Sequence, residues 1–163
     1  MSPLVIAVDD PRVADIHALL ERHLTFAMET TPPEHVFALD VDGLLHPSIT
    51  FFSARRDRQL LGIGALKELD AEHGELKSMH TAAAARRQGV GRAMVEHLLD
   101  VARQRRYRRV SLETGAMAAF VPARSLYESM GFVACGRFGD YPDNPDSAFM
   151  TTTFDEPLRG ASL

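Results

Sequence analysis

The segment RRQGVG, residues 86–91, stands directly before a stretch in which apolar side chains recur at helical spacing. Over residues 89–106 the apolar positions that share one helical face are Val90, Met94, Val95, Leu98, Leu99 and Ala102. Glycines at 89 and 91 let a ligand approach the main chain closely, and the start of a helix adds partial positive charge. The segment therefore predicts a loop and helix that bind an anion such as a pyrophosphate.

Two familiar phosphate-binding loops do not fit this spacing. The dinucleotide fingerprint needs a third glycine at position 94, where this chain has Met94. The P-loop needs a Gly-Lys-Ser/Thr sequence, which the chain lacks. The predicted anion site thus belongs to a ligand of a different class.

Composition predicts one ordinary globular domain, with 163 residues of which 45% are hydrophobic and 25% charged. The formal net charge of -4 argues against nucleic acid or an anionic membrane as a partner. No run approaches the roughly 18 apolar residues of a membrane span, and the N-terminus lacks the basic region of a signal peptide. A single cysteine, Cys135, excludes an internal disulfide and favours a reducing compartment, so we expect a cytoplasmic protein.

Periodicity and turn residues predict alternating strands and helices over residues 1–154, followed by a frayed tail at 155–163. We expect a helix from Pro11 to about Glu29, capped by Asp9 and Asp10, and a shorter helix between Pro32 and Gly43. The remaining helices are expected at 89–106 and 120–130. Strands are expected at 4–8, in a hairpin over 48–69 that turns at RRDR, and at 73–81, 108–114, 132–138 and 147–154. Cys135 would be buried in the middle of a strand and inert.

Two motifs together resemble the GNAT superfamily of N-acetyltransferases. Arg86-x-x-Gly89-x-Gly91 matches the family's pyrophosphate-binding signature, and ARSLYESMGF, residues 123–132, is similar to its helix ending in Leu-Tyr-Glu-x-x-Gly-Phe. The resemblance covers roughly residues 4–154. It implies an α/β (α+β) domain with a mixed, mostly antiparallel sheet of about six to seven strands, about four helices and a splayed strand pair that holds the acyl-CoA.

The resemblance also implies acetyl-CoA as co-substrate, no metal, and a primary amine of a small molecule or peptide as acceptor. The pyrophosphate would bind residues of the loop and helix start: Arg86, Arg87, Gln88, Gly89, Val90, Gly91 and Arg92. The main chain of Met79, His80 and Thr81 would pair with pantetheine and supply the oxyanion donor. Of the seven histidines, none shows a trusted metal-ligand spacing.

Two side chains are implied to be catalytic. Glu75 lies eleven residues before Arg86, where many relatives carry the base that deprotonates the amine. Tyr127 of the Leu-Tyr-Glu motif would protonate the departing thiolate. Each has an alternative: Glu75 could belong to a solvated face, with water or His80 as base, and Tyr127 could fill the core.

One residue departs from the family pattern. An asparagine often stands seven residues before the tyrosine and contacts the cofactor, whereas this chain has Phe120 there. That contact must be missing or replaced. The intact loop predicts that donor binding survives.

The acceptor cleft of such proteins is lined by the segments that correspond to residues 26–37 and 138–149. Both contain carboxylates, which would attract a cationic amine: Glu29, Glu34, Asp140, Asp143 and Asp146. The arginine-rich run RQRRYRR, 103–109, could bind nucleic acid, but its place at a helix C-terminus explains it better. A non-catalytic acyl-CoA sensor is the alternative function, and a homodimer is possible.

Overall fold

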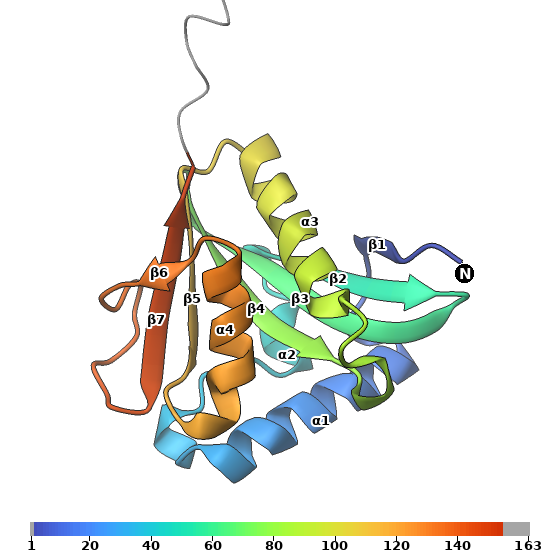
Figure 1. Cartoon of the computed structure of the whole chain (residues 1–163), viewed down its shortest axis with the longest axis horizontal. Coiled ribbons are helices and arrows are strands. Elements are labelled where there is room, and N and C mark those ends of the chain that lie inside the picture. Colours follow the sequence, from blue (N-terminus) through green and yellow to red (C-terminus); the bar gives the residue numbers. More distant parts are fainter. Residues whose placement is uncertain (1, 155–163) are drawn as a thin grey trace, which may run out of the picture.

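The computed structural model describes residues 2–154, and Figure 1 shows how its helices and strands are arranged. The strands are β1 (Val5–Val8), β2 (Ile49–Arg56), β3 (Gln59–Asp70), β4 (His73–Thr81), β5 (Arg109–Gly115), β6 (Val133–Ala134) and β7 (Ser147–Thr153). The α-helices are α1 (Ala14–Thr30), α2 (Val41–Leu44), α3 (Val90–Gln104) and α4 (Val121–Ser129). Short 3-10 turns lie at Pro33–His35, Ala83–Ala85 and Ala118–Phe120. The tail predicted at 155–163 lies outside the described residues.

One seven-stranded sheet runs through the molecule in the order β1-β2-β3-β4-β5-β7-β6. Every neighbouring pair is antiparallel except β4 and β5, which are parallel. This confirms the predicted fold class, a single domain with a mixed and mostly antiparallel sheet. The crossover between the two parallel strands is α3, which therefore starts at the carboxyl end of β4.

The sheet separates two hydrophobic clusters. Helix α1 buries Ile16 and Leu19 in a cluster that also contains Phe51 of β2. The next residue, Phe52, belongs to the larger cluster on the opposite face, beneath α3 and α4. Because neighbouring side chains of a strand point to opposite faces, this adjacent pair of phenylalanines places β2 between the two layers.

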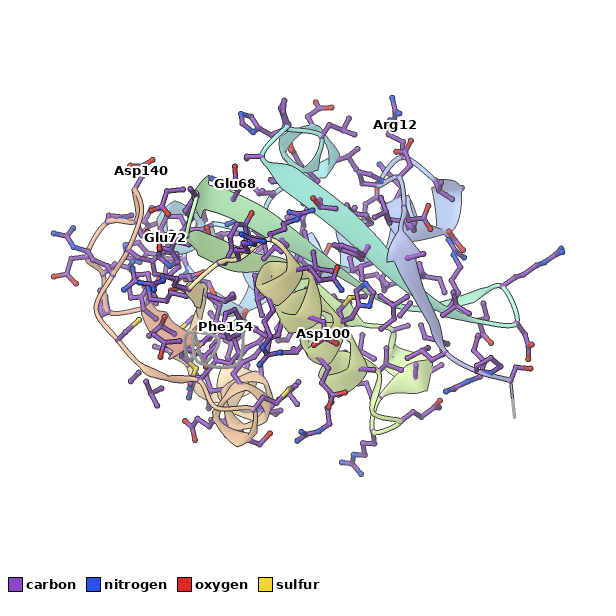
Figure 2. All side chains as sticks on the ribbon, turned by 90° about the horizontal axis from the view of Figure 1, so that it is seen from above. Arg12, Glu68, Glu72, Asp100, Asp140 and Phe154 are labelled. Carbon is purple, nitrogen blue, oxygen red and sulfur yellow. The ribbon has the colours of Figure 1, made fainter. Side chains whose placement is uncertain are left out.

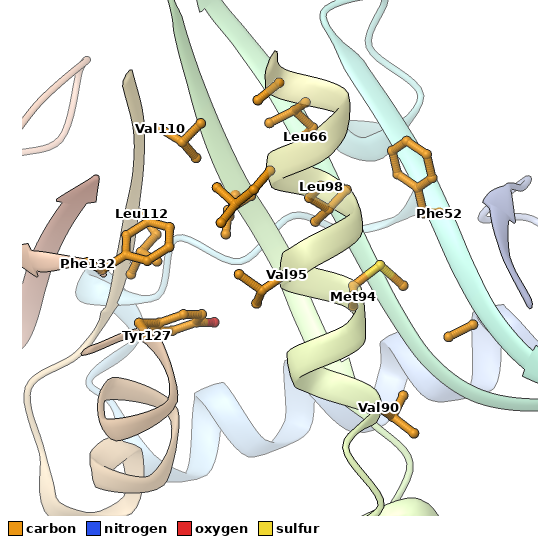
Figure 3. Packing of buried hydrophobic residues seen from close by; sticks show 14 of the residues in the cluster. Phe52, Leu66, Val90, Met94, Val95, Leu98, Val110, Leu112, Tyr127 and Phe132 are labelled. Atoms are coloured by element: carbon orange, nitrogen blue, oxygen red, sulfur yellow. The ribbon is translucent and has the colours of Figure 1, made fainter. Parts of the chain in front are cut away.

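Helix α3 forms the centre of the larger cluster, as Figure 3 shows. All six of its predicted apolar positions are buried: Val90, Met94, Val95, Leu98, Leu99 and Ala102. The helix ends at Gln104, so the arginine-rich run spans the helix end and the start of β5, as expected. Local pattern and tertiary structure agree throughout this element.

The predicted hairpin over 48–69 is also confirmed. Arg56 pairs with Gln59, and the two residues between them, Asp57 and Arg58, have φ values of 51° and 68°. Two consecutive positive φ angles give a turn whose twist suits neighbouring antiparallel strands. The structure accepts this conformation here without glycine.

Three sequence-based boundaries were wrong. Helix α1 begins at Ala14 without a side-chain cap, because Asp10 instead closes a turn by accepting hydrogen bonds from the main chain and side chain of Arg12. Prolines 32 and 33 open only a 3-10 turn, since the separate helix α2 has its own cap at Asp40. Residues 132–138 contribute only the two-residue strand β6.

Cys135 was therefore also placed wrongly. It follows β6, where its main-chain N–H donates to the carbonyl of Phe149, and its side chain is half-buried. Among the described residues, no helix is long and apolar enough to span a membrane.

Truncating the centre of the α3 interface tests this packing. Leu98 is fully buried, so Leu98→Ala removes apolar contacts and leaves a cavity. We expect the free energy of unfolding in urea to fall by about 2–5 kcal/mol. The exposed Glu96 on the same helix is the matched control, and Glu96→Ala is expected to change it by less than about 0.5 kcal/mol. Equal losses from both variants would contradict this description of α3.

Candidate active site

Strands β4 and β5 pair only over the first part of their length. His73–Leu76 pairs with Arg109–Leu112, and no strand pairing between them continues beyond Leu76 and Leu112. On its other side β4 still pairs with β3 as far as Thr81, with a bulge at Ser78, whose φ is 55°. The bulge redirects β4 away from β5. The predicted splayed strand pair is present, and one edge of residues 77–81 is left without a neighbouring strand.

A cavity of about 800 Å³ opens at this divergence. Its walls come from the end of α1, residues 35–38, the second half of β4, the loop before α3, the end of β5, and α4. Most sequence-predicted site residues line it: Met79, His80, Thr81, Arg86, Arg87, Gly89, Val90, Gly91, Arg92 and Tyr127. Gln88 and Glu75 are the two predicted residues that do not.

The loop before α3 has the conformation that an anion site requires. Arg87 and Gly89 have φ values of 65° and 78°, and α3 begins at the next residue, Val90. Alternating left-handed residues turn successive main-chain N–H groups toward one side, where the helix start adds its positive charge. The side chain of Gln88 faces away from the cavity and donates to the carbonyl of Ala84 over 3.2 Å. Gln88 therefore stabilises the loop from outside.

Tyr127 is buried in α4 and lines the cavity. Its ring packs edge-on against Phe132, and in Figure 3 its hydroxyl points toward α3. Burial raises its pKa to about 12. The phenol is therefore protonated at neutral pH, which is the state that a general acid needs.

Glu75 lies in the core next to the cavity and is only 2% exposed, so the solvated-face alternative is wrong. Its carboxylate accepts a hydrogen bond from the hydroxyl of Tyr141 and pairs with Lys77 at 3.3 Å. Lys77 also donates to the Tyr141 hydroxyl over 2.8 Å. Lys77 and Tyr141 line the cavity, whereas Glu75 reaches it through them.

Glu113, near the end of β5, is a cavity-lining carboxylate that sequence reasoning missed. It accepts a hydrogen bond from Ser147 over 2.6 Å, and burial raises its pKa. Lys77 and Glu75 are the charged groups that act on it. One signal for it was available: parallel strands end at the same edge of a sheet, so the last residues of β5 had to face the site built on β4.

His80 meets His23 of α1 across the cavity wall, with 3.1 Å between the two Nδ1 atoms. Burial lowers both pKa values to about 4, and the positive charges of Arg86 and Arg22 lower the pKa of His80 further. Both rings are thus neutral at pH 7, and one donates to the other. The pair links α1 to β4 at the bulge.

Phe120 replaces the expected asparagine with an aromatic wall. Its ring lies close to Gly115, where an added Cβ would come within 2.1 Å of it, and packs edge-on against Phe26 of α1. Arg124 holds the intervening turn by donating to the carbonyls of Gly115 and Met117. The glycine near the end of β5 is explained by this ring, because a side chain there would collide with it.

The prediction that five carboxylates of residues 26–37 and 138–149 line the acceptor cleft needs correction. Asp146 lines the cavity, but His35 already binds it at 2.5 Å. The other four carboxylates are exposed and do not line the cavity, namely Glu29, Glu34, Asp140 and Asp143, and Figure 2 shows Asp140 at the periphery. These four side chains are therefore hydrated and do not form a wall of the cavity. Within residues 2–154, no group of three or more His, Cys, Asp or Glu side chains could hold a metal ion.

Known proteins are similar to this chain in sequence and in architecture. The model of the acetyltransferase (GNAT) family matches residues 14–132. A Bacillus subtilis protein named uncharacterized N-acetyltransferase YsnE is 47% identical over 146 residues, 90% of this chain and 97% of that protein. The structure of a putative acyl-CoA N-acyltransferase from Klebsiella pneumoniae aligns with a TM-score of 0.77 at 25% identity, over 92% of this chain and 97% of that one. A GNAT family acetyltransferase from Elizabethkingia anophelis with acetyl-CoA bound has the same fold, with a TM-score of 0.65 at 16% identity, over 93% and 98% of the two chains.

The neutral histidine pair gives a pH prediction. Because the folded pKa values of His23 and His80 are near 4 rather than 6.5, the unfolded chain binds more protons between these pH values. The contribution of the neutral pair to the free energy of unfolding is therefore complete above pH 6.5 and is lost as pH falls toward 4. We expect NMR titration to show both rings neutral at pH 5.5, with His23→Gln identifying one signal. A midpoint near 6.5 for either ring would contradict the burial of the pair.

Proposed function

The chain belongs to the acetyltransferase (GNAT) family, and from this premise we propose that it transfers the acetyl group of acetyl-CoA to a primary amine by direct attack in a ternary complex. The carrying observation is one continuous cavity that joins a loop with left-handed residues at a helix start, an unpaired strand edge and a buried, protonated tyrosine. These are the three groups that an acyl-CoA donor needs: a site for the pyrophosphate, hydrogen bonds for pantetheine, and an acid for the thiolate.

The donor half of the proposal rests on the loop and on β4. Main-chain N–H groups of the loop and of the start of α3 would bind the pyrophosphate, with Arg86, Arg87 and Arg92 supplying positive charge. The free edge of Met79, His80 and Thr81 would pair with pantetheine as an added strand does. A main-chain N–H at this edge would donate to the thioester oxygen as negative charge develops on it. His80, bound to His23, would help to hold β4 in position.

The proposed proton steps use two separate tyrosines of the cavity lining, Tyr141 and Tyr127. In our proposal the ammonium form of the acceptor gives a proton to the Tyr141 oxygen while the Tyr141 hydroxyl proton passes to Glu75, which it already contacts. The amine nitrogen then forms a bond to the thioester carbon, and the C–S bond breaks. Tyr127 gives its hydroxyl proton to the leaving sulfur, and the second proton that the nitrogen loses on forming the amide restores the Tyr127 hydroxyl. Glu75 thus acts as the base through Tyr141, and burial beside Glu75 raises the pKa of Tyr141, so the relay starts from a neutral phenol.

The first test is acetyl-CoA-dependent thiol release with amino acids, polyamines, aminoglycosides and short peptides. Release of CoA thiol with one of these amines, together with detection of the acetylated amine, supports the proposed acetyltransferase activity. Tight acetyl-CoA binding without acetylation of any amine would contradict the proposal and favour the acyl-CoA sensor. Cytoplasmic location and homodimer formation stay predictions.

Removing the Tyr127 hydroxyl tests its proposed role as the general acid. Tyr127→Phe keeps the ring and its contact with Phe132, so we expect kcat to fall by about 10²-fold while acetyl-CoA affinity changes little. Tyr107→Phe is the control, because Tyr107 is equally buried but its hydroxyl binds Glu68, away from the cavity. Steady-state kinetics and calorimetric binding distinguish the two effects. Parallel loss of turnover and donor binding in Tyr127→Phe would assign the tyrosine to folding.

A carboxylate in the loop tests the donor site. Gly89→Glu places negative charge at the anion site and strains a residue with φ of 78°. We expect acetyl-CoA affinity to fall by at least about 10²-fold, from charge repulsion and loop distortion. Gly139→Glu is the matched control, because Gly139 also has positive φ and open space but lies outside the cavity lining. Unchanged donor affinity in Gly89→Glu would refute this placement of the pyrophosphate.

A further inference from the structure

The acceptor end of the cavity contains a buried charge cluster that is not balanced. Glu75, Glu113, Lys77 and Tyr141 come together there from β4, β5 and the loop before β7. When ionised, the two carboxylates and one ammonium leave one negative charge. A buried charge without a partner is costly, so this arrangement favours a cationic ligand.

The contacts assign the unbalanced charge to Glu113. Lys77 directs its ammonium to Glu75 and Tyr141, at 3.3 Å and 2.8 Å. The hydrogen bond that Glu113 accepts comes from the neutral hydroxyl of Ser147 and reaches Oε2. At this end of the cavity the other carboxylate, Asp146, is already paired with His35. Glu113 therefore faces the cavity with a carboxylate whose charge no cation pairs directly among the described residues.

The surrounding wall is aromatic. Phe26 packs edge-on against Phe120, and Phe37 packs edge-on against Tyr141, with all four residues lining the cavity. In each pair one ring comes from α1 or the segment after it, and the other from the C-terminal half of the chain. Such walls favour a flat apolar group, and their faces also attract an adjacent ammonium.

Resting on the proposed function, we propose that Glu113 binds the ammonium group of the acceptor, and that the acceptor is a primary amine on an apolar, aromatic-sized body without a carboxylate. Lys77 does not recruit an acidic substrate, because Glu75 already offsets its charge. The acceptor binds as a cation at Glu113. The ammonium then loses one proton through Tyr141 to Glu75, and the neutral nitrogen attacks the thioester.

Matched amines test this selectivity on the unmodified protein. We expect kcat/KM for phenethylamine to exceed that for phenylalanine and for glutamate by at least about tenfold. Putrescine, which has the charge without the ring, is expected to be poorer than phenethylamine. A preference for phenylalanine, glutamate or putrescine would overturn the inference while leaving the acetyltransferase proposal intact.

Glu113→Gln tests the residue itself. It is expected to raise the KM for phenethylamine by at least about tenfold, with acetyl-CoA affinity unchanged. Glu128→Gln is the control, because Glu128 is exposed on α4 and does not line the cavity. An unchanged KM in Glu113→Gln would exclude an ion pair between Glu113 and the ammonium group of the acceptor.

Binding measured without turnover separates the two proposals. Phenethylamine added to the wild-type complex with CoA is expected to raise the melting temperature, whereas 3-phenylpropionate, with a carboxylate on the same body, is not. A shift that Glu113→Gln abolishes, in a protein that acetylates no amine, would refute the proposed activity but support the Glu113 site. Stabilisation by 3-phenylpropionate instead would overturn the site.

Discussion

The separation of β4 from β5 is the constraint on which the site depends. A parallel pair that stayed in register would bury the main-chain groups of both strands and leave no room between them. The bulge at Ser78 ends this pairing while β3 keeps β4 in the sheet. The cost is visible locally, since Ser78 adopts a positive φ and its buried hydroxyl has no hydrogen-bond partner within the described residues. The sheet therefore opens between β4 and β5, while the hydrophobic clusters on its two faces stay intact.

The packing around the opening explains why it does not close. Helix α3 fills the larger cluster from β3 to β5, and its N-terminal turn is held to α4 by the hydrogen bond from Arg92 to Ser129. On the other face, His23 of α1 binds His80 directly after the bulge. Strand β4 is thus held to α1 beyond the bulge, and α3 and α4 are held to each other, so the cavity is a feature of the packed core.

Charge is distributed unevenly along this cavity. Arginines 86, 87 and 92 and the start of α3 make one end positive, whereas the other end has two carboxylates around a single lysine. Neutral histidines lie between these ends. An anionic donor and a cationic acceptor would therefore bind at opposite ends, with their reactive groups meeting near the β4 bulge.

The sequence by itself determined the elements whose signals are local. The period of α3 and the hairpin that turns at RRDR each depend on neighbouring residues, and both predictions agree with the structure. Tyr127 was found because its motif is contiguous. Its burial and raised pKa were not readable, because they depend on packing.

The tertiary structure alone decided the composition of the cavity end around Glu75 and Glu113. Tyr141 reaches Glu75 across 66 residues of chain, Ser147 reaches Glu113 across 34, and His35 reaches Asp146 across 111. No local pattern specifies such pairs, so the exposed loop carboxylates were mistaken for the cavity wall. Which carboxylates enter a cavity is set by where strands end and which side chains pair with them, and both follow from long-range packing.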